Sequence, residues 1–327
     1  MVVGPPVVAA RTGLRSDEDT VRHLARRWGN GQGISQGPGT TYGAESYGGN
    51  TMTRLLYALL VVALMVGTAQ AGTILLVSDS AATSDHDESF VTWLASLGHT
   101  VDTSGMGQAM REALDAGDKA AIEAADLVIV SRLTSSGSYD NDRKYWNEVD
   151  TPLILCSGYL TRGGGDHRWG WTTGGSGDAT KSVADLAVTA GQEGHGFLDG
   201  LTGPVALFDW SPGTEAPKGV YLPNAGDTYA GTVVGTFDGR PMLMDIPAGT
   251  DFDALNGTTD DYGTTAARRA LLGHWGYDNA DADQWEDHVT DDYKAVLGNM
   301  IGTMVPEPAT LALAGVGLGA MLLRRRR

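Results

Sequence analysis

Short apolar runs alternate with segments of helical periodicity over the first part of the chain's central region. Residues 73–78, 126–131 and 152–156 are apolar runs bounded by polar residues, and 100–103 is a shorter one, which predicts four strands. Residues 88–97 place Phe90, Leu94 and Leu97 at helical spacing before Gly98. Helices are also expected over 108–116, 119–125 and 141–149. Apolar strands separated by helices predict a parallel sheet with helices on both faces.

A second kind of apolar segment, at 55–66, lies outside this alternation. It follows Met52 and Arg54 and precedes Ala69-Gln-Ala71, which fits the small-residue cleavage pattern of a secretory signal peptide. Cleavage after Ala71 would expose Gly72. Residues 1–51 are then interpreted as a disordered extension or an overcalled start, because 30–50 is rich in Gly, Ser and Thr without an apolar period. An ordered extension is the alternative.

A third apolar segment, at 309–323, closes the chain. Its 15 uncharged residues would span roughly 22 Å as a helix, less than the ~30 Å of a bilayer core, so it is a short membrane helix. Pro306 and Pro308 separate it from the preceding domain. The basic cluster is held on the cytoplasmic side, which leaves the upstream chain outside. This cluster consists of Arg324, Arg325, Arg326 and Arg327.

The order Pro-Glu-Pro, short helix and arginine cluster over residues 305–327 resembles the PEP-CTERM sorting signal of bacterial exported proteins. The resemblance implies that an exosortase, a membrane-embedded protease, recognises Pro306, Glu307 and Pro308 and passes the protein to the cell surface or extracellular matrix. An ordinary anchor that stays in the membrane is the alternative. Signal peptidase and the secretion machinery are the other expected processing partners.

The charge of the segment between these signals is strongly negative. The whole chain carries a formal net charge of −17, and residues 72–305 hold 35 Asp and Glu against 13 Lys and Arg, a net of −22. Such a chain repels nucleic acid and anionic membrane surfaces. Cys156 is the one cysteine, so no internal disulfide is possible. The expected organisation is 1–51 extension, 52–71 signal peptide, 72–304 one α/β domain and 305–327 sorting signal.

The central region resembles the class I glutamine amidotransferase-like fold, a flavodoxin-like α/β three-layer sandwich with a mostly parallel sheet. The resemblance lies in strings such as ILLVSDS, LGHTVDT, AADLVIVSR, TPLILCSGYLTR, RPMLMDIPAGT and ARRALLGHW. It implies a cysteine nucleophile on a Gly-x-Cys-x-Gly turn after the fourth strand. It also implies a His and a Glu two residues apart near the end of the domain.

The catalytic pattern of that family is incomplete in this chain. Cys156 or Ser157 falls at the expected strand end, but Ile154 stands where the first glycine of the turn is needed. His274 follows the late strand, yet Gly276 replaces the glutamate. A thiol without an oriented base is a poor nucleophile. We therefore expect a non-catalytic module, with a degenerate cysteine or serine hydrolase or amidase at Cys156 and Ser157 as the alternative.

Ligand-binding candidates lie in the loops that follow the strands, where open α/β sheets bind ligands. A Gly-rich loop at 163–178 carries His167, Trp169 and Trp171, whose rings could stack on a sugar or a partner, or else cover the core. The acidic segments 85–88, 166–167 and 279–283 are interpreted as solvated loops, so no metal or cofactor is expected. The predicted function is an exported surface or matrix protein that binds an extracellular polysaccharide or protein.

Overall fold

The computed structural model describes residues 72–305, apart from short gaps within that range. The gaps are 81–84, 108–109, 111–112, 135–136, 138, 140, 164–167, 179–184, 210–217, 258–259, 277–284 and 287–288. All described residues belong to one compact unit, residues 59–327. The signal peptide at 52–71, the preceding extension and the tail from Pro306 lie outside the described residues.

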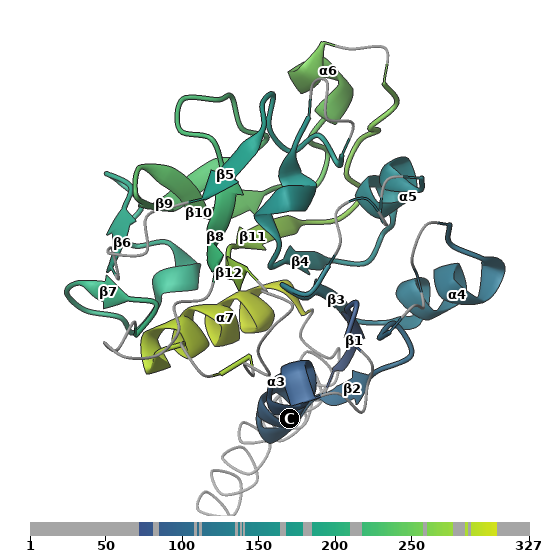
Figure 1. Cartoon of the computed structure of the whole chain (residues 1–327), viewed down its shortest axis with the longest axis horizontal. Coiled ribbons are helices and arrows are strands. Elements are labelled where there is room, and N and C mark those ends of the chain that lie inside the picture. Colours follow the sequence, from purple (N-terminus) through teal and green to yellow (C-terminus); the bar gives the residue numbers. More distant parts are fainter. Residues whose placement is uncertain are drawn as a thin grey trace, which may run out of the picture. The chain divides into compact units, whose positions relative to one another are not determined.

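A nine-stranded sheet forms the centre of the domain (Figure 1), in the order β2-β1-β3-β4-β11-β10-β9-β6-β7. Its first five strands are parallel to one another. They are β2 (Thr100–Asp102), β1 (Thr73–Val77), β3 (Leu127–Val130), β4 (Leu153–Leu155) and β11 (Arg269–Leu272). The strands β3 and β4 are apolar and fully buried, and β11 is fully buried although it begins with Arg269, as expected for a sheet covered on both faces.

The other four strands run antiparallel to their neighbours. They are β10 (Arg240–Ile246), β9 (Thr232–Phe237), β6 (Asp185–Val188) and β7 (Val205–Ala206). Asp238 and Gly239 join β9 to β10, both with positive φ, 51° and 70°, which is the geometry of a type I′ hairpin turn. The expectation of a mostly parallel sheet is therefore wrong for this half. A two-residue connection can only pair strands antiparallel, since a parallel pair needs a crossover.

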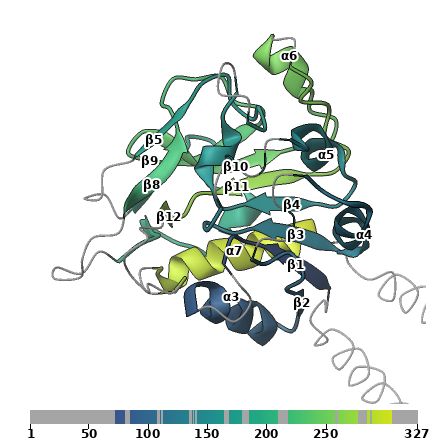
Figure 2. The same ribbon diagram turned by 45° about the vertical axis from the view of Figure 1, so that its right-hand side comes forward.

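Helices cover both faces of the parallel strands (Figure 2). On one face lie α3 (Asp85–Ser96) and α7 (Asp291–Met304), and on the other lie α4 (Ala116–Ala124) and α5 (Arg143–Glu148). Alternate residues of each strand face the two layers, so that Ile74 contacts the α3 and α7 core while Leu75 contacts the α4 and α5 core. The predicted helices at 88–97, 119–125 and 141–149 are confirmed within a few residues.

Smaller elements complete the described domain. A second sheet has the order β12-β8-β5, and three short helical segments lie in the connections. These elements are β12 (Trp275–Gly276), β8 (Lys218–Pro223), β5 (Ser176–Asp178), η2 (Gly158–Thr161), η4 (Gly196–Leu198) and α6 (Phe252–Asn256). The strand β8 matters for the functional site, because it packs on η2 directly after β4.

The two ends of the domain adjoin. A side-chain carbon at Gly72, the residue before β1, would lie 3.0 Å from Cγ1 of Val305, the residue that ends α7. Val305 is buried, and the α7 helix therefore runs back to the amino end of the parallel strands. No helix in the described part of the chain is long and apolar enough to cross a membrane, and the apolar segments 55–66 and 309–323 lie outside that part.

Candidate functional site

The carboxyl ends of three parallel strands meet at a buried polar cluster. Ser78 follows β1, Ser131 follows β3 and Cys156 follows β4, and Asp87 reaches them from the first turn of α3. With Tyr293 of α7, these residues are called the Asp87 cluster below. Each is at most 1% exposed. The strand order brings them together, because parallel strands end at the same edge of a sheet.

Asp87 organises the cluster through one of its two carboxylate oxygens. Its Oδ2 accepts a hydrogen bond of 2.6 Å from the hydroxyl of Ser78 and one of 2.8 Å from the hydroxyl of Ser131. Its Oδ1 is buried and accepts no hydrogen bond from any described residue. A buried carboxylate oxygen without a donor has lost its hydration without gaining a hydrogen bond, so this atom lowers the stability of the folded domain.

Cys156 is a protonated thiol in this environment. Burial raises its pKa to about 12, and the negative charge of Asp87 adds to the shift, while the hydroxyl of Tyr293 acts against both. That hydroxyl lies near the thiol but forms no hydrogen bond of good geometry with a described group. Burial also raises the pKa of Tyr293 well above its ordinary value, so the phenol is a poor base. The thiol therefore lacks the means to become a thiolate at neutral pH.

The strand end that carries Cys156 and Ser157 is covered by backbone. A side-chain carbon at Gly158 would lie 2.0 Å from the carbonyl oxygen of Tyr221 in β8, so only glycine permits this approach. Ser157 is 5% exposed and makes no side-chain hydrogen bond to η2. The close packing of β8 on η2 explains why both candidate nucleophiles are closed off from solvent.

His274 joins the same strand end through its backbone. Its amide donates to the carbonyl of Cys156 at 3.1 Å, and its ring is 2% exposed. The ring packs edge-on against Tyr293, with 5.2 Å between centroids. The three sequence candidates Cys156, Ser157 and His274 therefore do converge, and the phenol of Tyr293 lies beside the thiol.

Sequence reasoning did not single out Asp87, Tyr293, Ser78 or Ser131 as site residues. A signal for Asp87 was available, since it lies in the acidic segment 85–88 directly after the first strand. The expectation of a solvated loop is wrong at this position, because Asp87 is fully buried. Tyr293 carries no such signal, because it lies on a helix far along the chain. Among the described residues, no group of three or more His, Cys, Asp or Glu side chains is arranged to hold a metal ion.

Trp169 and Trp171 are core residues. Both are 0% exposed, and their indole N–H groups donate to the carbonyl of Tyr139 at 3.1 Å and to Oδ1 of Asn147 at 2.9 Å. Buried rings offer no face for a sugar, so the alternative in which they cover the core agrees with this placement, and the stacking interpretation is dropped. His167 and the acidic segments 166–167 and 279–283 lie outside the described residues.

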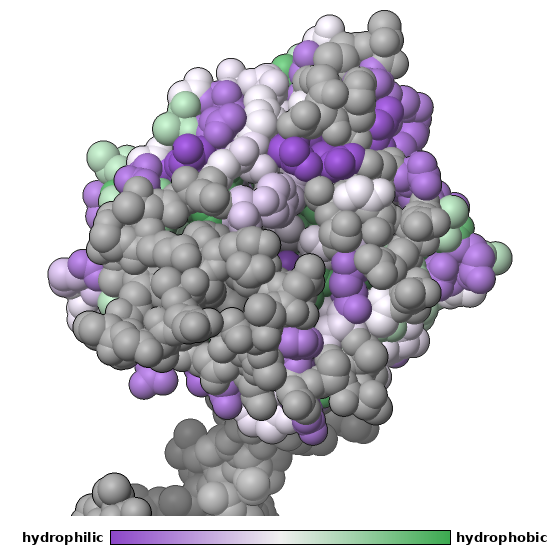
Figure 3. Space-filling model, viewed as in Figure 1, coloured by the Kyte–Doolittle hydropathy of each residue, from purple (hydrophilic) through white to green (hydrophobic). Residues whose placement is uncertain are grey.

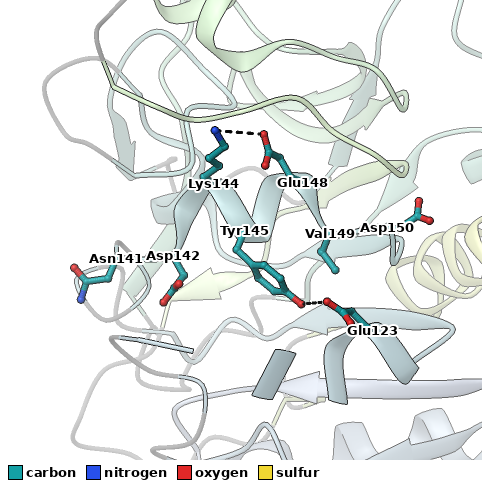
Figure 4. Close-up of a pocket in the computed structure, with 8 residues that line it drawn as sticks. All are labelled: Glu123, Asn141, Asp142, Lys144, Tyr145, Glu148, Val149 and Asp150. Carbon is teal, nitrogen blue, oxygen red and sulfur yellow. Dashed lines mark hydrogen bonds and ion pairs between the residues drawn. The ribbon is translucent and has the colours of Figure 1, made fainter. Parts of the chain in front are cut away.

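A surface hollow of about 470 Å³ lies between α4 and α5 (Figure 4). Its walls are charged, and several of their side chains are paired with one another or with neighbours. Tyr145 donates to Glu123 at 3.0 Å, and Lys144 lies 3.8 Å from Glu148 and 2.8 Å from Asp261. The hydrogen bond from Tyr145 to Glu123 links the two helices, and the three pairings leave few polar groups in the hollow for a ligand.

On the face shown in Figure 3, hydrophilic residues predominate over the described part and apolar residues form small separate patches. This agrees with the acidic composition of the domain. A mainly polar surface is typical of a domain that is solvated on its own.

The comparisons with known proteins identify the C-terminal segment. Residues 305–327 match the family model described as the PEP-CTERM protein-sorting motif, and this match begins at Val305, where α7 ends. Comparison with curated proteins and with solved structures gives no match. The motif supports processing by exosortase, a membrane protease, with export and transient membrane anchoring before processing. The chain therefore carries the signal of an exosortase-sorted protein of the cell surface or extracellular space.

Proposed function

We propose that this protein is displayed outside the cell by exosortase processing, and that its α/β domain is a non-catalytic, amidotransferase-like module that binds a matrix component or a protein. The strand order of the parallel half, β2-β1-β3-β4-β11, supports the fold assignment. It corresponds to the flavodoxin-like order 2-1-3-4-5, with the antiparallel strands added beyond the fifth.

The observation that carries the non-catalytic assignment is the state of Cys156. The thiol is 1% exposed, its pKa is raised to about 12 by burial, and β8 covers the strand end. A nucleophilic cysteine requires the opposite environment, with access for the substrate and a neighbouring group that stabilises the thiolate. A hydrolase at Cys156 or Ser157 remains the second candidate, favoured by the convergence of both residues with His274 at one strand end.

The position of the two processing points supports display in one orientation. Gly72, the expected first residue after signal cleavage, packs against Val305, the last residue before Pro306. Both therefore lie at the amino edge of the sheet. While the tail holds the protein in the membrane, this edge faces the bilayer, and the carboxyl edge with the Asp87 cluster points away from it.

Intact mass tests the processing half of the proposal. The full chain is expressed in a bacterium that contains an exosortase, and protein is recovered from the medium and from the membrane fraction. We expect a released form that begins at Gly72 and ends near Pro306. A matched variant, Glu307→Gln, is expected to stay in the membrane fraction with Arg327 attached. A wild-type protein found in the membrane fraction alone, with Arg327 retained, contradicts release.

Thiol reactivity tests the non-catalytic half. A maleimide reagent at neutral pH is expected to label Cys156 in the unfolded protein and to leave the folded protein unlabelled over the same time. Esterase and amidase substrates are assayed with the wild type and with the double variant Cys156→Ala, Ser157→Ala. Rapid labelling of the folded protein together with hydrolysis that the double variant loses would establish the hydrolase instead.

A further inference from the structure

A second surface hollow, of about 370 Å³, lies on the outer face of α3 beside the segment that contains Trp285 and Glu286. It is distinct from the Asp87 cluster, which lies under the opposite face of the same helix. Its lining combines one aromatic ring with hydroxyl and carboxylate groups. The lining residues are Glu88, Ser89, Thr92, Trp93, Ser96 and Glu286.

Trp93 is the outermost member of a stack of three aromatic rings. Phe90 and Trp285 are buried and lie parallel, with 4.4 Å between centroids and an angle of 6°. Trp93 stacks on Trp285 at 5.3 Å and 28° and is half-buried. The inner rings fix the orientation of the indole, so a ligand that stacks on Trp93 meets a preorganised surface and loses little side-chain entropy.

Three polar groups of this hollow are unpaired among the described residues, while the hydroxyl of Ser96 donates to the backbone carbonyl of Trp93 at 2.6 Å. Glu88 and Thr92 make no ion pair or side-chain hydrogen bond with any described residue, and the buried hydroxyl of Ser89 has no partner there. Glu286 lies 3.7 Å from Lys294, an ion pair that leaves it partly exposed. The hollow between α4 and α5 differs, because its Glu123, Glu148 and Tyr145 side chains are already paired.

This lining selects a ligand by its chemistry. Carboxylates accept hydrogen bonds, and serine and threonine hydroxyls both donate and accept them, which suits a molecule rich in hydroxyl groups. The indole offers an apolar platform for the C–H face of a ring, or for a cation. Glu88 and Glu286 repel acidic ligands, as does the net charge of the domain.

We propose that the Trp93 hollow is a carbohydrate-binding site for a sugar ring that is neutral or carries an amino group. The sugar stacks on the half-buried indole of Trp93, and its hydroxyl groups donate to the carboxylates of Glu88 and Glu286. This inference rests on the binding function proposed above and gives that function a ligand class. The location on the outer face of α3 leaves the site open to a polymer from the side of the domain.

Isothermal titration calorimetry with the full chain tests the site, with three oligosaccharides of equal length as probes. These are cellohexaose, the hexamer of glucosamine and hexagalacturonic acid. We expect binding of the first two and none of the third. Trp93→Ala is expected to weaken binding about tenfold or more, and Trp93→Phe to retain part of it. Glu88→Gln is expected to weaken the binding of the glucosamine hexamer more than the binding of cellohexaose.

Tyr145→Ala is the matched control, since it removes a partly exposed ring from the other hollow and is expected to leave sugar binding unchanged. Glu88→Gln also keeps the test valid if Trp93→Ala fails to fold, because Glu88 is an exposed side chain. Binding that neither Trp93→Phe nor Glu88→Gln alters overturns the proposal, as does binding of an oligolysine peptide with no sugar binding. Absence of all binding also overturns it, while the mass experiment on processing is unaffected by any of these results.

Discussion

Two buried polar regions of this domain differ in how completely their hydrogen bonds are made. In the Asp87 cluster, one carboxylate oxygen of Asp87 and the hydroxyl of Tyr293 have no partner among the described residues. At the opposite edge of the sheet, the guanidinium of Arg269 is equally buried, and its two terminal nitrogens donate to six backbone carbonyls, while its Nε has no partner among the described residues. These belong to Trp146, Asn147, Val149, Thr151, Ala267 and Arg268. With the side chain of Asn147, this region is called the Arg269 cluster.

The difference indicates a structural role for the Arg269 cluster and a candidate functional role for the Asp87 cluster. Arg269 donates hydrogen bonds to the free carbonyls at the end of α5 and before the start of β4. The last carbonyls of a helix need such partners when the helix end is buried. The Asp87 cluster contains buried polar atoms that have no hydrogen-bond partner among the described residues. It lies at the carboxyl edge of the sheet, where α/β sheets bind ligands. Unsatisfied polar groups that persist in a folded domain are expected at functional or formerly functional positions.

The largest expected effect is at Arg269. Arg269→Met keeps the length of the side chain and removes every donor, so several buried carbonyls lose their partners. We expect the free energy of unfolding to fall by about 3–5 kcal/mol, measured by urea denaturation. Arg268→Met is the control, because Arg268 pairs with the half-buried Asp245, and about 1 kcal/mol is expected. Equal losses in the two variants would remove the structural role assigned to Arg269.

Asn147 is the next test of the Arg269 cluster. Its amide donates to the carbonyls of Trp169 and Tyr262 at 2.8 and 2.9 Å, and its oxygen accepts from Trp171. Asn147→Leu fills the same space without polar atoms and is expected to cost about 2–3 kcal/mol of unfolding free energy. Asn299→Leu, at a partly exposed amide, should cost about 1 kcal/mol in the same assay. An unchanged free energy of unfolding in Asn147→Leu would mean that apolar packing can replace these hydrogen bonds.

The pH dependence of stability tests the Asp87 cluster through Cys156. The folded thiol keeps its proton up to a pKa of about 12, whereas the unfolded thiol releases it near the ordinary value of 9.0. Unfolding therefore releases a proton between these values, and stability falls as pH rises through this window. Relative to Cys156→Ala, the free energy of unfolding of the wild type should fall by about 1.4 kcal/mol per pH unit above 9, or by roughly 2 kcal/mol in total at pH 10.5. If the unfolding free energies of the two proteins change with pH in the same way, the raised pKa of the buried Cys156 thiol is refuted.

The smallest expected effect is at Asp87 itself. Asp87→Asn keeps an oxygen for Ser78 and Ser131 and removes the charge that burial penalises, so stability should change by less than about 1 kcal/mol in either direction. The pKa of Cys156 should fall, because the negative charge of Asp87 contributes to raising it. Alkylation rate against pH in mild denaturant measures that shift. Ser131→Ala, which removes one donor from the carboxylate, should cost more than Asp87→Asn, and the reverse order would contradict this account.

The parallel half of the fold was predictable because its signals are local. The strands at 73–78, 126–131 and 152–156 are continuous apolar runs, and the helix at 88–97 shows helical spacing before Gly98. The antiparallel half was not, although Asp238-Gly239 is a turn signal for a hairpin. The strands β6 and β7 contain four and two residues, too few for a period to appear in the sequence.

The candidate site was predictable only in part, for a related reason. Cys156, Ser157 and His274 were located because each follows a strand in order. Their burial was not visible, since it depends on β8, which is remote in the sequence and packs its Tyr221 carbonyl on Gly158. Trp93 was overlooked as a surface ring because it lies in a helix of mixed apolar and polar residues. Trp169 and Trp171 were considered for binding because glycines surround them.

The sequence by itself determined which sorting signal this protein carries. The motif at 305–327 is a property of neighbouring residues, so no fold is needed to read it. The tertiary structure decided which side chains are accessible. Asp87 bonds to Ser78 nine residues away and to Ser131 forty-four residues away, and such distant contacts set burial, pKa and partner choice. Local sequence cannot contain that information, because burial is the sum of packing from every part of the folded chain.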